Sequence, residues 1–79
     1  MDIQMHERVR QIIAEELQCP SSDVRSGTSL RKDLGMDSVA AINIVFAIEE
    51  TFGVRVPEAE LEHVDDMDQI IRLVDQYRT

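Results

Sequence analysis

The fold is decided by the stretch SVAAINIVFAIEETF, residues 38–52, which is followed by Gly53. Its apolar residues recur at the spacing of an α-helix, and one stripe of them is wide enough to face a core: Ala41, Ile44, Val45, Ile48 and Phe52. Glycine tolerates a positive φ, so Gly53 is a natural residue to end this helix. We therefore predict a helix from Ser38 to Phe52.

A second apolar group lies on a different side of the same helix. It consists of Val39, Ile42 and Phe46, and the acidic residues Glu49 and Glu50 flank it. A small bundle with one core does not need this second group. Either the helix is central and packs on two sides, or the group is an exposed hydrophobic patch with acidic edges, which is how a protein-docking surface looks.

Helical periodicity appears twice more in the chain. A first helix is predicted from about Ile3 to Leu17, with Val9, Ile12, Ile13 and Leu17 on its apolar stripe. A last helix is predicted to start near Asp66, because an Asp followed three residues later by Gln69 resembles a capping box; its stripe is Met67, Ile70, Ile71, Val74 and Tyr77. Before it, Pro57 suits the start of a short helix over about Glu58 to Glu62.

The connection between the first two long helices is about 20 residues, from Gln18 to Asp37. Single apolar residues at wide spacing, namely Val24, Leu30 and Leu34, are expected to pin it to the core. No segment is long enough to form a sheet. The sequence thus predicts one all-α domain over residues 1–79, a small four-helix bundle with three longer helices, one short helix and a long first loop.

Charge narrows the classes of partner. Sixteen acidic and eight basic residues give a formal charge of −8, which argues against nucleic acid and favours basic protein surfaces or cations. Eight acids lie between Glu49 and Asp68, opposed only by Arg55. This segment is either a solvated face that aids solubility or a surface that steers basic partners.

Membrane insertion and secretion are not expected. The longest apolar run is five residues, Ile44 to Ile48, whereas a helix needs roughly 20 to cross a bilayer. No apolar segment follows Met1-Asp2, so no secretory signal is expected. The single Cys19 cannot form an internal disulfide and is expected to fill the edge of the core. We expect a monomeric, cytoplasmic protein.

Ser38 stands at the start of the helix with two apolar sides, and Leu34-Gly35-Met36-Asp37 precedes it. Either Asp37 or Ser38 could be the N-cap, and Gly35 would allow a tight approach to the helix. A negative group on the Ser38 hydroxyl would lie at the positive end of the helix dipole, near free backbone N–H groups. A phosphodiester attached there would be tolerated.

The segment DLGMDSV, residues 33–39, resembles the Asp-Leu-Gly-x-Asp-Ser-Leu signature of the acyl carrier protein family. The resemblance covers essentially the whole chain and extends to Glu7-Arg8-Val9, Ile12-Ile13, Glu49-Glu50-x-Phe52 and Val56-Pro57. It implies a carrier without catalytic residues, which delivers acyl groups to enzymes of fatty acid, polyketide or related specialised lipid biosynthesis. A separate phosphopantetheinyl transferase would attach a 4′-phosphopantetheine arm from coenzyme A to Ser38, and the thiol of the arm would hold the acyl group as a thioester.

The resemblance also implies roles for neighbouring residues. Asp37 would help the transferase to place its metal and coenzyme. The surface for acyl-loading and acyl-transferring enzymes, which carry basic docking surfaces, would comprise Val39, Ile42, Phe46, Glu49 and Glu50. Ala40 and Asn43 stand where carriers of fatty acid synthesis usually have acids, which makes a specialised pathway credible. Met36 in place of a second glycine argues against peptidyl carriers.

Three other functions fit the residues less well. Catalysis by Ser38 would need a base, but His6 and His63 have no recognisable spacing with it. A calcium loop starting at Asp66 would need Gly and Glu where the chain has Ile71 and Tyr77, so no metal site is predicted beyond weak surface binding of divalent cations. An unmodified helical adaptor would share the fold and surface, with Ser38 merely capping.

Overall fold

The computed structural model describes residues 3–78; its regular secondary structure is helical, with no strand in that range. Three α-helices are joined by two 3₁₀ turns: α1 Ile3–Leu17, η1 Ser21–Asp23, α2 Ser38–Phe52, η2 Glu58–His63 and α3 Met67–Tyr77. The predicted bundle is confirmed: α1 and α2 have the expected bounds, and α3 starts directly after Asp66 as expected. The turn η1 was not predicted, because three polar residues leave no apolar periodicity to recognise.

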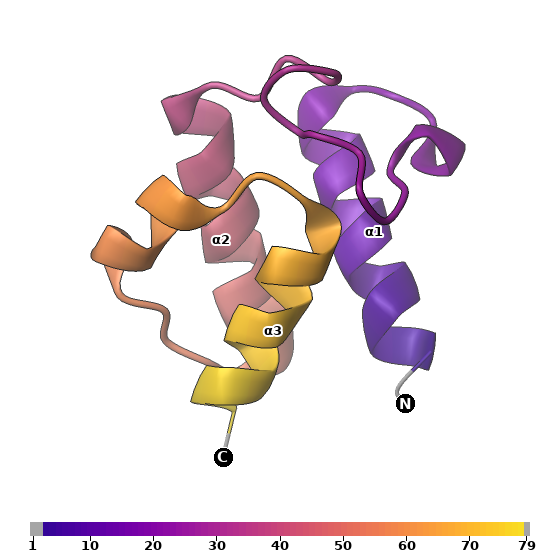
Figure 1. Ribbon diagram of the computed structural model, residues 1–79. Coiled ribbons are helices and arrows are strands. Elements are labelled where there is room, and N and C mark those ends of the chain that lie inside the picture. Colours follow the sequence, from indigo (N-terminus) through magenta and orange to yellow (C-terminus); the bar gives the residue numbers. More distant parts are fainter. Residues whose placement is uncertain (1–2, 79) are drawn as a thin grey trace.

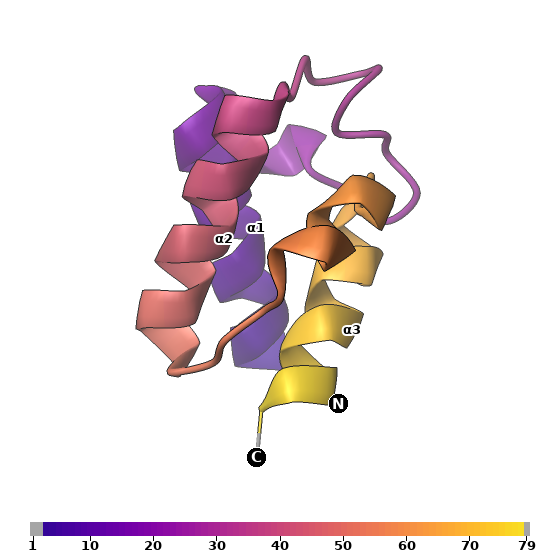
Figure 2. The same cartoon turned by 90° about the vertical axis from the view of Figure 1, so that its left-hand side faces the viewer.

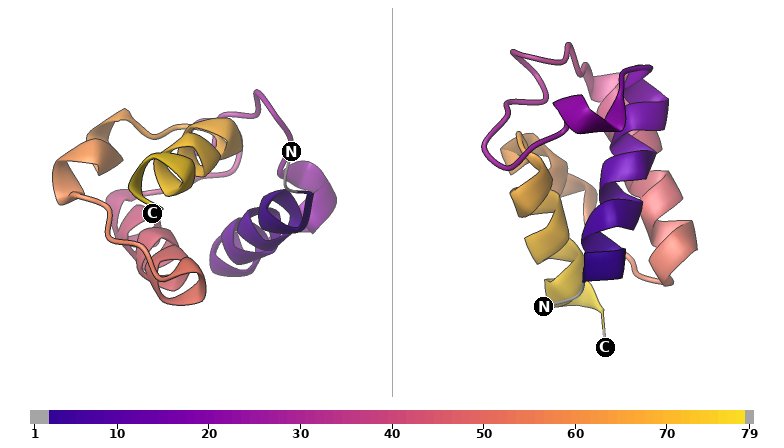
Figure 3. Two further views of the ribbon diagram at one scale, coloured as in Figure 1. Left: turned by 90° about the horizontal axis from the view of Figure 1, so that it is seen from below. Right: turned by 90° about the vertical axis from the view of Figure 1, so that its right-hand side faces the viewer.

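The three α-helices surround one core, and the left view of Figure 3, from below, shows their ribbons arranged around a common centre. α1 runs antiparallel to α2, and α3 packs beside α1 (Figure 1). The short η2 covers the side between α2 and α3 (Figure 2). The core draws on all three α-helices and on the connections: Met5, Val9, Ile13, Ala14, Val24, Leu30, Met36, Ala41, Ile44, Ile48, Val54, Val64, Met67, Ile70, Ile71, Leu73 and Val74.

The long connection crosses the end of the bundle where α1 finishes and α2 begins (Figure 1). Val24 and Leu30 are fully buried in the core, as expected, and Leu34 is half-buried. Met36 is a further anchor, 5% exposed, that the spacing did not indicate. Each such anchor contributes roughly 1.5–3 kcal/mol on full burial, which is how a segment without regular structure is held in place.

The helix ends follow the local sequence. Asp37, not Ser38, caps α2, because its Oδ1 accepts a hydrogen bond of 2.8 Å from the Ala40 N–H. Asp66 and Gln69 form the predicted capping box at α3. Gly53 ends α2 in the left-handed conformation with φ 67°.

Two local expectations need correction. Gly35 does not permit a close approach, since a Cβ there would meet nothing within 4 Å; it is needed for its φ of +72°. The short helix after Pro57 is a 3₁₀ turn that extends to His63, because its bonds run from Glu60 N–H to Pro57 C=O and from Val64 N–H to Leu61 C=O. No helix among residues 3–78 is long and apolar enough to cross a membrane.

Candidate functional site

Ser38 is the first residue of α2 and is exposed to solvent. Its hydroxyl has no hydrogen-bond partner within the described part of the chain, because Asp37 performs the capping. The oxygen therefore lies free at the positive end of the α2 dipole, where a negatively charged substituent is favoured. The arrangement fits a phosphodiester on this oxygen without loss of any existing contact.

Two adjoining hollows run from Ser38 along α2, and we call them together the α2–η2 groove. The first, of about 320 Å³, is lined by Arg31, Ser38, Ala41, Ile42, Glu58, Leu61 and Glu62. The second, of about 140 Å³, is lined by Ile42, Val45, Phe46, Glu49, Val56, Glu58 and Leu61. Both share Ile42, Glu58 and Leu61, so the groove has an apolar floor and a charged rim.

The second apolar group of α2 is largely in solvent. The side chains of Val39 and Phe46 are 64% and 60% exposed, and Ile42 is half-buried between them as part of the groove. The alternative in which α2 packs against the protein on two sides is therefore wrong for Val39 and Phe46. The alternative in which the second apolar group is an exposed patch is confirmed for these two side chains. We call these three residues the α2 patch; it begins directly after Ser38.

The two acids at the far end of the α2 patch differ in burial and in their hydrogen bonds. Glu50 is exposed. Glu49 is half-buried, and its Oε2 accepts a hydrogen bond of 2.8 Å from the Val56 N–H, which ties the chain after α2 back to the helix. Glu49 therefore has a structural contact that the sequence did not indicate.

A cation from another region lies against the acidic segment that ends at Asp68. The Arg31 guanidinium lies against η2: its Nε donates to the Val64 carbonyl and its Nη2 to the Leu61 carbonyl, both at 3.2 Å. Arg55 is thus not the only cation near these acids. The contact joins residues 30 or more positions apart, which is why no local pattern revealed it.

Two acids near Asp66, Asp65 and Asp68, hold the long connection in place. Asp65 accepts hydrogen bonds from the Ser29 hydroxyl at 2.9 Å and from the Arg31 N–H at 3.2 Å. Asp68 accepts one from the Ser26 hydroxyl at 3.0 Å. Within residues 3–78 no three His, Cys, Asp or Glu side chains are grouped to hold a metal ion.

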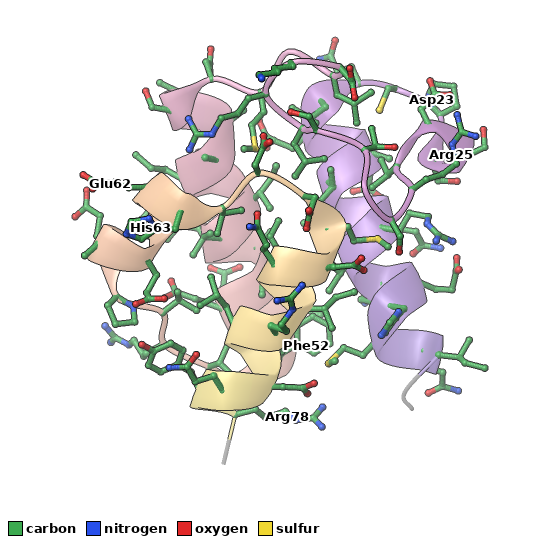
Figure 4. All side chains as sticks on the ribbon, in the orientation of Figure 1. Asp23, Arg25, Phe52, Glu62, His63 and Arg78 are labelled. Carbon is green, nitrogen blue, oxygen red and sulfur yellow. The ribbon has the colours of Figure 1, made fainter. Side chains whose placement is uncertain are left out.

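The residues considered for catalysis do not gather around Ser38. His6 is half-buried on α1 and His63 exposed on η2; neither lines the groove. Figure 4 shows Glu62 and His63 on η2 at the side of the bundle. Cys19 packs at the core edge, as expected. Burial raises the pKa of its thiol, and the Asp23 carboxylate adds a smaller effect in the same direction. The thiol therefore stays protonated at neutral pH.

Comparison with known proteins agrees with this geometry. A family model described as "Phosphopantetheine attachment site" matches residues 7–74, which is most of the chain. An acyl carrier protein of Saccharopolyspora erythraea is 34% identical over 70 residues, covering 89% of this chain and 74% of the relative.

Proposed function

The chain belongs to the acyl carrier protein family, and we propose that Ser38 is the residue that carries its 4′-phosphopantetheine arm. Members of this family are carriers, not enzymes, and their cofactor is this covalently bound arm. The arm supplies a terminal thiol that holds an acyl group as a thioester. The observation that supports Ser38 is its free, exposed hydroxyl at the N-terminus of α2, with the α2–η2 groove beside it.

The chain's own residues would orient the arm and present it to partners. Asp37 fixes the first turn of α2 and thereby the position of the Ser38 oxygen. In our proposal its exposed carboxylate also helps the phosphopantetheinyl transferase to place its metal and coenzyme. Tethering then raises the effective concentration of the acyl group at each partner enzyme.

The α2 patch, together with Glu49 and Glu50, would dock acyl-loading and acyl-transferring enzymes that have basic surfaces. The support is the combination of exposed Val39 and Phe46 with acids at one end, on a chain of formal charge −8. Apolar contacts would supply affinity, and the acids would speed the encounter.

The pathway belongs to fatty acid, polyketide or related specialised lipid biosynthesis, and we favour a specialised one. Ala40 is half-buried against the core, and the Asn43 Nδ2 donates a hydrogen bond of 3.3 Å to Glu16 on α1. The first turns of α2 therefore offer partners no carboxylate of their own beyond Asp37. We further propose a monomeric carrier domain over residues 1–79 that acts in the cytoplasm.

Arm attachment tests the proposal. Incubation with coenzyme A and a broad-specificity phosphopantetheinyl transferase should add the mass of one arm, and Ser38→Ala should abolish the gain completely. Ser22→Ala is the matched control, because Ser22 is also exposed but lies in η1; this variant should be modified normally. No gain in the wild type would favour an unmodified adaptor, and a gain in Ser38→Ala would place the arm elsewhere.

A further inference from the structure

Arg31 is held in a defined place by three contacts. Its guanidinium donates to the Val64 and Leu61 carbonyls, and its backbone N–H donates to Asp65 Oδ1 at 3.2 Å. A guanidinium has five N–H donors, so several remain unused. No carboxylate forms an ion pair with Arg31 among residues 3–78. The side chain is thus oriented by neutral carbonyl groups, and its guanidinium is not engaged in an ion pair within residues 3–78.

Arg31 lines the same hollow as Ser38 and is the one Lys or Arg of the described chain that does so. The other charged residues of this hollow are Glu58 and Glu62, and Asp37 adjoins Ser38 in sequence. A phosphodiester on Ser38 would carry a negative charge beside these carboxylates. A nearby cation would offset this repulsion in addition to the α2 dipole, and Arg31 is the cation that lines the hollow.

Taking the attachment at Ser38 as its premise, we propose that the Arg31 guanidinium binds the phosphodiester of the arm and so holds the arm at the α2–η2 groove. Guanidinium groups suit phosphate oxygens because their N–H donors form a planar fork. With the phosphate held, the arm starts at the end of the groove whose floor is formed by Ala41, Ile42 and Leu61. Arg31 then acts as a positioning residue that sets how often the arm lies against the protein.

The test compares three arm-bearing proteins: the wild type, Arg31→Gln and Lys32→Gln. Lys32 is the matched control, since it is the next residue, is exposed, changes the net charge equally and does not line the groove. NMR measures contacts between arm methylenes and the methyl groups of Ala41, Ile42 and Leu61, and the ³¹P shift of the phosphodiester. In Arg31→Gln the ratio of docked to free arm should fall by about two- to fivefold, the range of an exposed charged contact. Lys32→Gln should resemble the wild type.

Because Arg31 also supports η2, its effect on folding is separated from its effect on the arm. The melting temperature is measured for each protein with and without the arm, and attachment should stabilise the wild type and Lys32→Gln more than Arg31→Gln. Arg31→Lys should restore part of the docking, and added salt should weaken that part. Equal arm contacts and ³¹P shifts in Arg31→Gln and Lys32→Gln would overturn the inference. Absence of any arm in the wild type would instead overturn the attachment itself.

Discussion

α2 and α3 use their apolar residues differently, although both start at an aspartate cap. Every aliphatic residue of α3 is buried: Met67, Ile70, Ile71, Leu73 and Val74. α2 buries Ala41, Ile44, Val45 and Ile48 but leaves Val39 and Phe46 mostly in water. The composition of α3 is explained by folding alone. That of α2 exceeds what folding requires, and the excess lies next to Ser38.

The largest difference between these helices should appear on truncation. Ile70→Ala in α3 removes a side chain that is 3% exposed and should lower the free energy of unfolding by about 2–5 kcal/mol. Phe46→Ala in α2 should change it by no more than about 0.5 kcal/mol, yet should slow acyl loading by a partner enzyme. Urea unfolding and loading rates measure the two effects. A loss of several kcal/mol in Phe46→Ala would show that Phe46 belongs to the core.

The two caps provide a smaller and more specific contrast. Asp66→Ala and Asp37→Ala should each cost about 1 kcal/mol in unfolding free energy, with the larger loss at Asp66, whose capping box is reciprocal. Asn is as good an N-cap as Asp, so Asp37→Asn should keep the stability and still slow arm attachment if the carboxylate serves the transferase. Attachment at the wild-type rate in Asp37→Asn would limit Asp37 to capping.

The smallest effect concerns the acids between Glu49 and Asp68, none of which is buried in the core. Their mutual repulsion should be reduced by added salt or magnesium, so the melting temperature should rise modestly. Arg31 already offsets part of this repulsion from the opposite segment. The rise should therefore be larger in Arg31→Gln than in Lys32→Gln. A constant or lower melting temperature with salt would contradict the idea of net repulsion.

Much of the fold could be read from periodicity. The bounds of α1 and α2, the end at Gly53 and the capping box of α3 depend on neighbours within one helical turn, so local sequence specifies them. η1 was missed because a three-residue turn has no period, and Met36 was missed because nothing in the irregular connection shows which of its apolar side chains turn inward. Leu73 was missed because it lies beside the expected stripe, and only packing shows how wide the buried face of α3 is.

The candidate site also combines features that the sequence indicated with features that only the tertiary structure decided. Sequence alone indicated Ser38 as the candidate attachment residue, its place at a helix N-terminus, and the second apolar group of α2, since all of these lie within one continuous segment. Sequence left open which residue caps α2 and whether the second group is buried, because both depend on backbone direction and on what packs nearby. The tertiary structure decided these points and brought Arg31 to η2, a contact across some 30 residues that no local rule encodes. Local hydrogen bonding fixes helices, whereas exposure and long-range charge placement exist only once the helices have packed.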